Sequence, residues 1–438
     1  MMPTDSVITL LLLMFMVWAL IRDKMRPGLI LFTVVILMLC CGILTPKECL
    51  EGFSNKGMIT VALLFLVSEG VRQSGMLERI IHKMMPKEGC SLTIVSLRIF
   101  PMVSFISAFL NNTPVVVIFA PMVRTWANKV GLSASKLLIP LSYATILGGI
   151  CTLIGTSTNL VVDGLMLDSG MEGLSMFELS KVGVFVCLGG LAYLISVSRY
   201  LLPETTNKEV DEENKRDEFD DTNLSRRKRW LALILLVFMV LGATVGELPL
   251  VREAVPNFRF DMFFFAAITC IIMAWTGMFS TRRYSRYISW DILITIACAF
   301  GISKGMMNSG FADFLASYVI EMSQKVAMNH GGIYMMLVVL YAITNVFTEL
   351  ITNNAAAALG FPLALSVANQ LGVDPMPFCV CIAVAASAAF STPIGYQTNL
   401  IVQSEGGYRF TDFMRVGLPL NFIVFVITVL LIPLVYDI

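Results

Sequence analysis

The chain has few charged side chains and almost no histidine. Among its 438 residues, 14% are Asp, Glu, Lys or Arg and two are His, whereas 57% are hydrophobic. The mean hydropathy is +0.79, which excludes an ordinary soluble globule. The stretches 7–21, 29–44 and 230–245 are nearly free of charge and approach the length that crosses roughly 30 Å of hydrocarbon. The sequence therefore predicts a protein that crosses a membrane several times.

Further absences narrow the function. The first apolar stretch has neither a basic start nor a small-residue cleavage site, so we expect a retained span. Cys379 and Cys381 have the wrong spacing for a C-x-x-C motif, so metal or redox chemistry is not expected. A proton relay through histidine is unsupported, and the candidate acids at membrane depth are Glu69 and Glu349. Because no nucleophile lies beside a base there, we expect neither an enzyme nor an organic cofactor.

One segment is written twice in the chain. Residues 152–160 read TLIGTSTNL, and residues 392–400 read TPIGYQTNL. Each copy interrupts an apolar run and follows an earlier interruption, NNTP at 111–114 and TNN at 352–354. Paired interruptions at matching positions of two halves point to the binding site of a transporter built from repeats.

We predict an all-α polytopic membrane protein made of two inverted-topology repeats, 1–202 and 230–438, joined by a charged cytoplasmic linker, 203–229. Each repeat is expected to have five spans, one re-entrant hairpin and one broken helix. Because five is odd, the second repeat lies upside down relative to the first. The hairpins are placed at 95–127 and 332–370, and the broken spans at 136–169 (interrupted at 155–159) and 377–403. The other spans are placed at 7–21, 27–44, 57–74, 182–202, 229–246, 261–279, 290–307 and 414–435.

The placement of Lys and Arg predicts the orientation. Basic residues gather in the loops on the same side as the linker and are scarce in the opposite loops, so that side is cytoplasmic. Both termini are then outside, in a plasma (inner) membrane. The linker is interpreted as a solvated connection; a lipid-specific or nucleic-acid role for its basic end, RRKR at 226–229, is a weaker hypothesis. Membrane lipid is an expected partner and nucleic acid is not.

The breaks themselves favour ion binding. Irregular backbone at membrane depth needs protein or a water-filled cavity to satisfy its polar groups. Free carbonyls and Asn, Ser and Thr oxygens suit a small hard cation, whereas free N–H groups at a helix start suit an anion. Asn112 and Asn353 can each offer an oxygen to a cation and an NH₂ to an anion. Because acids are scarce, Na⁺ coupling fits better than proton coupling.

The motifs also resemble a known family. The segments 111–113 and 352–354 resemble the Ser-Asn-Thr signatures at the hairpin tips of the divalent-anion/sodium symporter family, and 155–159 and 395–399 resemble its broken-helix motifs. The resemblance implies a homodimer that moves its substrate by an elevator mechanism. The implied Na⁺ ligands are Ser107, Asn111, Asn112 and Gly155 at one site, and Thr348, Thr352, Asn353 and Gly395 at the other. The implied anion contacts are Asn112, Thr113, Thr156, Asn353, Asn354, Tyr396 and Gln397.

The chain also departs from that family. Ser157-Thr158 and Gln397-Thr398 replace prolines of its dicarboxylate carriers, and the pattern GYQTNL at 395–400 looks closer to the sulfate-permease branch. The short central loop argues against a soluble regulatory domain. We therefore expect Na⁺-driven uptake of a small divalent anion, sulfate first; the alternatives are a C4-dicarboxylate carrier and a passive anion channel. Two roles stay open: Glu349 is either structural or coupling, and Arg98 either snorkels or binds substrate.

Overall fold

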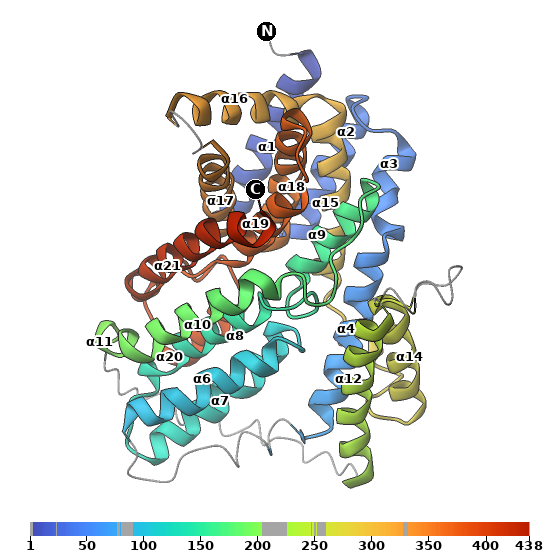
Figure 1. Ribbon diagram of the computed structural model, residues 1–438. Helices are drawn as coiled ribbons and strands as arrows, with labels where there is room; N and C mark the ends of the chain where they lie inside the picture. Colours follow the sequence, from blue (N-terminus) through green and yellow to red (C-terminus); the bar gives the residue numbers. More distant parts are fainter. Residues whose placement is uncertain are drawn as a thin grey trace.

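The computed structural model describes residues 3–437 except 23, 77–78, 80–90, 204–225, 247, 249–250, 252–259 and 327–331. The described residues are helical or irregular, and none of them forms a strand (Figure 1). The first half contains α1 (Thr4–Arg22), α2 (Pro27–Cys40), α3 (Pro46–Glu51), α4 (Lys56–Gln73), α6 (Leu92–Ser107), α7 (Asn112–Lys129), α8 (Leu138–Gly149), α9 (Ser157–Asp168), α10 (Ser180–Ser196) and α11 (Ser198–Leu201). The second half contains α12 (Arg226–Gly246), α14 (Met262–Trp275), α15 (Trp290–Asn308), α16 (Phe311–Val326), α17 (Gly332–Leu350), α18 (Asn353–Leu371), α19 (Met376–Ser387), α20 (Gln397–Gly406) and α21 (Phe410–Tyr436).

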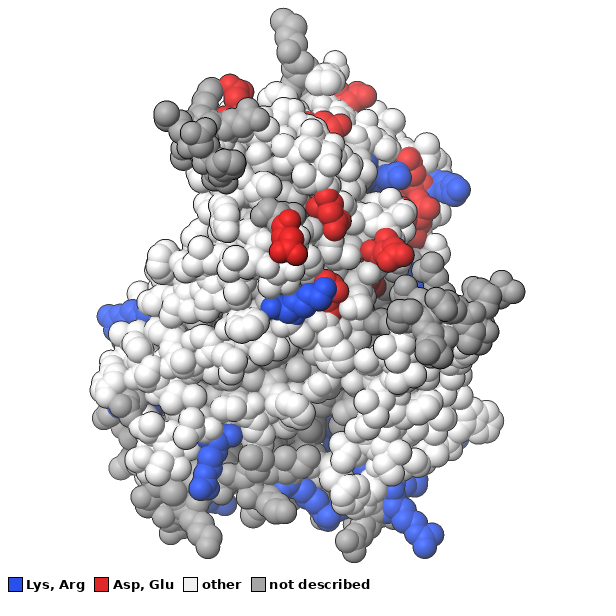
Figure 2. Space-filling model, in the orientation of Figure 1, with Lys and Arg blue, Asp and Glu red and all other residues white. Residues whose placement is uncertain are grey.

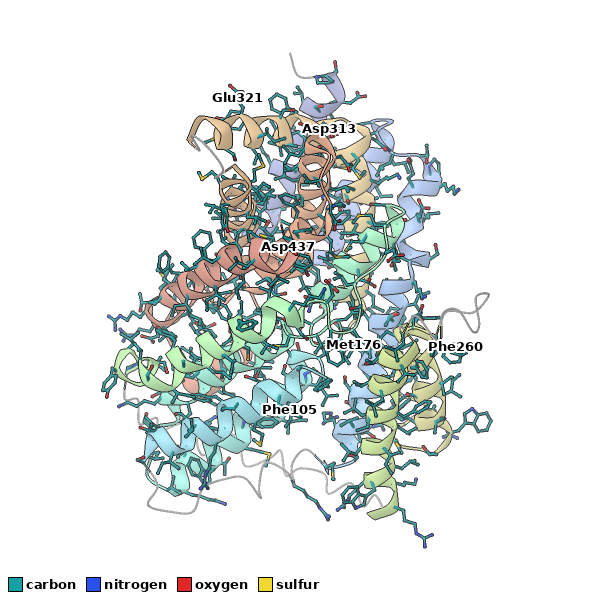
Figure 3. All side chains as sticks on the ribbon, in the orientation of Figure 1. Phe105, Met176, Phe260, Asp313, Glu321 and Asp437 are labelled. Carbon is teal, nitrogen blue, oxygen red and sulfur yellow. The ribbon has the colours of Figure 1, made fainter. Side chains whose placement is uncertain are left out.

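Helix lengths agree with an integral, multi-pass membrane protein. In the described part of the chain, six helical segments are long and apolar enough to cross a membrane, and five further apolar helices are shorter. The helices α8 and α9 have 12 residues each, and at 1.5 Å of rise per residue neither crosses roughly 30 Å alone. Phe105 on α6 is 69% exposed and lies on the outer surface (Figure 3), where lipid would cover it.

By their contacts, the helices other than α16 can be assigned to two groups that pack against each other. The scaffold group consists of α1 to α4, α12, α14 and α15; the hairpin group consists of α6 to α11 and α17 to α21. Inside the hairpin group the packing is matched across the halves: α6 lies on α8 as α17 lies on α19, and α7 contacts α20 as α18 contacts α9. The helices α10 and α21 pack against each other. This crossed arrangement is that of two inverted repeats.

Both predicted hairpins are present, and each turns at its polar motif. The pair α6 and α7 turns at 108–111, and the pair α17 and α18 turns at 351–352. Asn112 and Asn353 are the first residues of α7 and α18. The backbone N–H groups at the start of each returning helix therefore face the region between the two hairpins.

The first break is not where the sequence placed it. The prediction put it at 155–159, but the chain is irregular from 150 to 156, and Ser157 already begins α9. The reason is Asn159, whose side-chain N–H₂ donates to Gly149 O (3.1 Å) and Thr152 O (2.8 Å). Placed in the first turn of α9, this amide satisfies carbonyls that the end of α8 leaves free.

The second break is closed in the same way. It covers 388–396, between α19 and α20. The side-chain N–H₂ of Asn399 donates to Ala389 O (3.0 Å) and Thr392 O (3.1 Å). The final Asn of each repeated segment therefore holds the break closed from the helix that follows it.

The sequence prediction missed two helices, α3 and α16, and assigned the start of α12 to the linker. We predicted no element between 308 and 331, yet α16 lies across the upper end of the molecule in Figure 1. Its buried side is apolar (Phe311, Ala312, Ala316 and Val319), and Glu321 projects away from the body (Figure 3). Because an amphipathic surface helix carries polar residues on one side, a search for uniformly apolar spans does not find it. Residues 226–229, assigned to the linker, form the first turn of α12.

Candidate functional site

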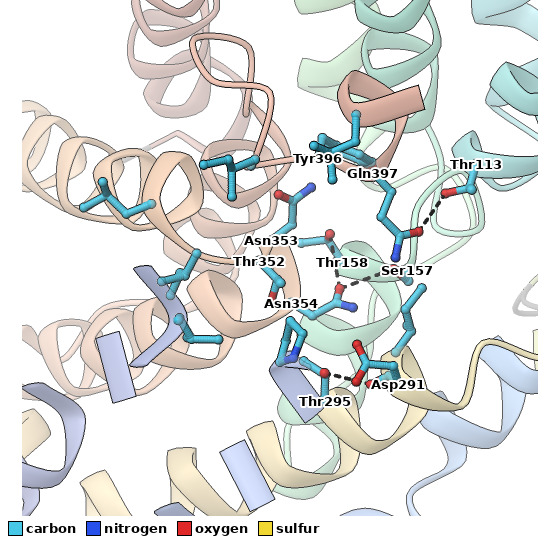
Figure 4. Close-up of a pocket in the computed structure, with 18 of the residues that line it drawn as sticks. Thr113, Ser157, Thr158, Asp291, Thr295, Thr352, Asn353, Asn354, Tyr396 and Gln397 are labelled. Carbon is cyan, nitrogen blue, oxygen red and sulfur yellow. Dashed lines mark hydrogen bonds between the residues drawn. The ribbon is translucent and has the colours of Figure 1, made fainter. Parts of the chain in front are cut away.

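A cavity of about 270 Å³ lies where the tips and breaks of both halves meet the scaffold group (Figure 4). Eight residues named from the sequence line it: Asn111, Thr113, Thr352, Asn353, Asn354, Gly395, Tyr396 and Gln397. Four helices begin at this cavity, α7, α9, α18 and α20. Each contributes unpaired N–H groups and the positive end of its dipole, which favour an anion. No lining residue is Lys or Arg, and Arg98 lies on the exposed side of α6.

The first hairpin tip forms a set of converging oxygens, which we call the first cage. One polar atom of the Asn112 amide lies 2.5 Å from Ser107 Oγ, 3.1 Å from Gly155 O and 3.2 Å from Thr145 O. A Cβ on Gly149 would lie 2.5 Å from Asn112 Oδ1, so only glycine lets the end of α8 approach this amide. Of the four Na⁺ ligands predicted here, three meet in the cage, whereas Asn111 lies at the start of α7 and lines the cavity instead.

The second tip forms a corresponding second cage. Thr348 Oγ1 lies 2.9 Å from Asn353 Oδ1 and 2.5 Å from Ala386 O, and it can donate its hydrogen to either. A Cβ on Gly395 would lie 2.8 Å from Thr348 O, so the break approaches the tip closely here as well. Thr352, the fourth predicted ligand, precedes α18 and lines the cavity.

Glu349 lies next to the second cage and supports the second break. Its Oε1 accepts from the backbone N–H groups of Phe390 (2.9 Å) and Ser391 (2.7 Å) and from Asn421 Nδ2 (2.6 Å). Its backbone carbonyl accepts from Thr392 Oγ1. These contacts support the structural role considered for Glu349. Its carboxylate also lies one residue along the chain from Thr348 of the second cage.

Tyr396 crosses from the second half to the first. Its hydroxyl lies 2.5 Å from Asn112 Nδ2 and 2.8 Å from Thr156 Oγ1. Asn112 and Thr156 are consequently almost completely buried, at 0% and 2% exposed, and they do not line the cavity. This differs from the expected direct anion contacts, because both residues contact Tyr396, which lines the cavity, and do not line it themselves. Thr113 Oγ1 donates to Gln397 Oε1 (3.3 Å) beside it.

Sequence reasoning missed several lining residues. Ser157 and Thr158 hydroxyls donate to Asn354 Oδ1 at 3.3 and 3.4 Å (Figure 4); their place in the repeated segment was the available signal. Asp291 and Thr295 on α15 also line the cavity. Asp291 Oδ1 accepts from Gly28 N (3.1 Å) at the start of α2, so a carboxylate of the scaffold faces the anion cavity. Nothing in the sequence signals this, because the contact joins the two halves.

The chain can now be compared with known proteins. It matches the family model described as CitMHS, citrate transporter, over residues 11–372 and 335–437. The chain belongs to this family. Members are transporters, and the resemblance to divalent-anion/sodium symporters that the motifs carry is confirmed.

Individual relatives agree with this assignment. Sodium/sulfate cotransporter 1 of Chlamydomonas reinhardtii is 36% identical over 46% of this chain and 24% of that protein. The sodium-dependent dicarboxylate transporter SdcS of Staphylococcus saprophyticus is 21% identical over 89% of this chain and 78% of its own length. The crystal structure of the YdaH transporter of Alcanivorax borkumensis superposes with a TM-score of 0.60 at 14% identity, covering 90% of this chain and 88% of that one. This last likeness supports the fold.

Proposed function

We propose that this CitMHS-family protein is a symporter that uses Na⁺ to take up a small divalent anion, with sulfate as the first candidate. The observation that carries the proposal is the convergence of four helix N-termini on one cavity flanked by two oxygen cages. The N-termini favour an anion, and the cages favour a small hard cation. Because no Lys or Arg lines the cavity, bound Na⁺ supplies the positive charge that a divalent anion lacks there.

The two cages are the proposed Na⁺ sites. Both combine a hydroxyl, an asparagine amide and a carbonyl of the preceding half-helix, and all of these donors are neutral oxygens. The Na⁺ dependence in the names of the relatives, a sodium/sulfate cotransporter and a sodium-dependent dicarboxylate transporter, agrees with this choice of ion. Coupling follows because the anion site is electrostatically incomplete until the cations are bound.

The choice of sulfate depends on Tyr396. This residue lines the cavity and reaches across to the first half, and its bulk leaves less length for a dicarboxylate. A C4-dicarboxylate remains the second candidate, because the cavity extends toward Thr295 on α15 and a dicarboxylate carrier is among the relatives.

The packing supports an elevator mechanism. The helix α15 packs closely on α18 and α4 packs on α9, whereas the counterpart pair α4 and α7 touches only slightly. Across the two repeats, α4 corresponds to α15, α7 to α18 and α9 to α20. If the two halves exchanged their contacts, α4 would pack on α7 and α15 would pack on α20. We propose this exchanged arrangement as the second end state, reached by sliding the hairpin group along the scaffold group. The homodimer stays a prediction from the family resemblance, and the division at 203–229 stays a prediction from the charge of that stretch of sequence.

The distribution of charge supports the proposed orientation. On the face shown in Figure 2, Asp and Glu lie in the upper part together with some Lys and Arg, whereas along the lower end, where α12 begins, the charged residues seen are Lys and Arg. Placing the lower end in the cytoplasm follows the positive-inside rule. The N-terminus then lies outside, as predicted for both termini, and the membrane is the plasma (inner) membrane.

Uptake into proteoliposomes tests the function. With an inward Na⁺ gradient, we expect radiolabelled sulfate to accumulate above its external concentration, and replacing Na⁺ with choline should abolish this accumulation. Unlabelled sulfate, thiosulfate, phosphate, succinate and citrate, added as competitors, rank the substrates. Equilibration without accumulation would instead indicate a passive anion channel, and uptake that does not depend on Na⁺ would refute the proposal.

A further inference from the structure

The Asn112 side chain lies between the first cage and Tyr396. One of its polar atoms faces Ser107 Oγ, Thr145 O and Gly155 O, and the other lies 2.5 Å from the Tyr396 hydroxyl. The residue is fully buried, so water does not compete for either atom. Because the oxygen and nitrogen ends of an asparagine amide have nearly the same shape, two orientations fit this space.

The two orientations make different sets of contacts. With Oδ1 in the cage, this atom accepts from Ser107 Oγ (2.5 Å), and it adds an oxygen to the carbonyls of Thr145 and Gly155. That arrangement suits a cation, because four oxygens then converge and the Ser107 hydroxyl supplies the one hydrogen among them. With Nδ2 in the cage, the NH₂ group lies within hydrogen-bond distance of all three oxygens, and its two hydrogens replace the cation.

The same reversal changes the hydrogen bond to Tyr396. When Nδ2 faces the tyrosine, it donates to the hydroxyl oxygen; if Thr156 Oγ1 (2.8 Å) also donates to that oxygen, the hydroxyl hydrogen is available to another acceptor. When Oδ1 faces the tyrosine, the hydroxyl must donate its hydrogen to Asn112. Tyr396 lines the cavity, so the orientation of Asn112 decides whether this hydrogen can be donated to an anion.

We propose that Na⁺ entering the first cage fixes Asn112 with Oδ1 toward the cation, and that this releases the Tyr396 hydroxyl to donate to the anion. Thr145 O is then an additional ligand of the first cation, and Tyr396 is a positioning residue that links cation and anion. Without Na⁺ the amide reverses, the tyrosine hydrogen is held by Asn112, and the anion loses a donor. The inference rests on the proposed function and explains how Na⁺ and anion binding are coupled at this site.

The second half differs in one partner. Asn353 Oδ1 lies 2.9 Å from Thr348 Oγ1, as Asn112 Oδ1 lies 2.5 Å from Ser107 Oγ, and the Asn353 amide lies beside Tyr396 in Figure 4. The position in the first half that matches Tyr396 is Thr156, whose short side chain does not reach across to Asn353. The hydroxyl of Tyr396 is thus the point at which both tips can influence the anion.

A linkage measurement tests the proposal. The Na⁺ concentration that half-saturates the thermal shift of the purified full-length protein is determined with and without sulfate, with choline keeping the ionic strength constant. In the wild type we expect sulfate to lower this concentration about tenfold. In Tyr396→Phe, which keeps the ring and removes the hydroxyl, we expect a change of less than about threefold.

Tyr193→Phe is the matched control. The Tyr193 hydroxyl donates to Val416 O (3.0 Å) between α10 and α21, outside the cavity, so this variant should keep the wild-type effect of sulfate. Retention of the full effect in Tyr396→Phe would overturn the switch and leave the proposed function intact. If neither sulfate nor succinate nor citrate shifts the Na⁺ dependence of the wild type, the proposed function itself fails.

A second measurement does not require a variant to fold. Electron cryo-microscopy maps of the wild type in NaCl and in choline chloride are compared at the first cage. We expect density in NaCl alone, bounded by Ser107 Oγ, Thr145 O, Gly155 O and the Asn112 amide, at roughly 2.3–2.6 Å from its ligands. A cation at that distance requires the amide oxygen, so this density would establish the orientation. Identical maps at saturating Na⁺ would refute it.

Discussion

The two broken helices have some residues in common and differ at other positions. The common residues and the differing residues have different roles. In both halves the first Thr of the repeated segment donates to the hairpin tip, Thr152 to Ala108 O and Thr392 to Glu349 O. In both, the final Asn closes the break. The Thr and Asn that occur in both copies therefore hold each broken helix in place, and we call them the frame residues.

The unshared residues supply the chemistry. Thr156 in the first half corresponds to Tyr396 in the second, and only the tyrosine reaches across to the opposite tip. Ala108 in the first half corresponds to Glu349 in the second, so only the second cage has a carboxylate beside it. We infer that the second cage holds Na⁺ more tightly, whereas the first cage communicates with the anion.

The largest expected effect comes from removing either tip amide. Asn112→Ala and Asn353→Ala should each reduce Na⁺-driven sulfate uptake at least about 100-fold, because each loses a cation ligand and a contact to Tyr396. The proteins should stay folded, since the substitution leaves the backbone of α7 and α18 unchanged. Uptake in proteoliposomes, with monodispersity as the control, measures this. Undiminished uptake in either variant would remove that cage from the mechanism.

The frame residues should affect stability instead. Asn159→Ala and Asn399→Ala each remove two hydrogen bonds to free carbonyls, which costs about 2–4 kcal/mol of unfolding free energy. The loss should be larger for Asn399, because its Oδ1 also accepts from Ser142 Oγ (2.8 Å). Thermal unfolding in detergent gives the comparison, and a larger loss for Asn159 would contradict it.

The charge difference between the halves predicts a smaller effect on Na⁺ affinity. Glu349→Gln keeps an acceptor for Phe390 N and Ser391 N but removes the charge, so we expect the half-saturating Na⁺ concentration to rise about tenfold. Glu69→Gln is the control, because Glu69 pairs with Arg72 at the end of α4, away from the cavity. Equal Na⁺ dependence in both variants would assign Glu349 a structural role alone.

The smallest effect is expected where the scaffold faces the anion. Asp291→Asn keeps an acceptor for Gly28 N and removes a negative charge from the cavity wall. Sulfate affinity at fixed Na⁺ should rise about threefold. If affinity falls instead, Asp291 binds a cation, and the cavity is not purely an anion site.

The sequence predicted most of the frame and part of the site. Polar breaks in apolar runs located both hairpins, and the repeated segment located both broken helices, because lipid permits irregular backbone only where protein satisfies it. The amphipathic α16 was missed, since its apolar residues follow helical spacing without forming a run. Thr145 was missed because it contributes a backbone carbonyl, which no residue type signals. The position of Asp291 at the cavity and the burial of Asn112 against Tyr396 both depend on contacts between the halves. The local sequence does not encode such contacts. His82 and His330 lie outside the described residues.

The asymmetric closure of the two breaks has a consequence for assembly during synthesis. The first break is tied by Asn159 to carbonyls of its own half, so it can close before the second half exists. The second break has the same ties within its own half and, in addition, partners in the first half: Ser142 donates to Asn399, and the Tyr143 hydroxyl donates to Phe390 O. The N-terminal half can therefore act as the template on which the C-terminal half completes its broken helix, which matches the order in which a ribosome delivers them.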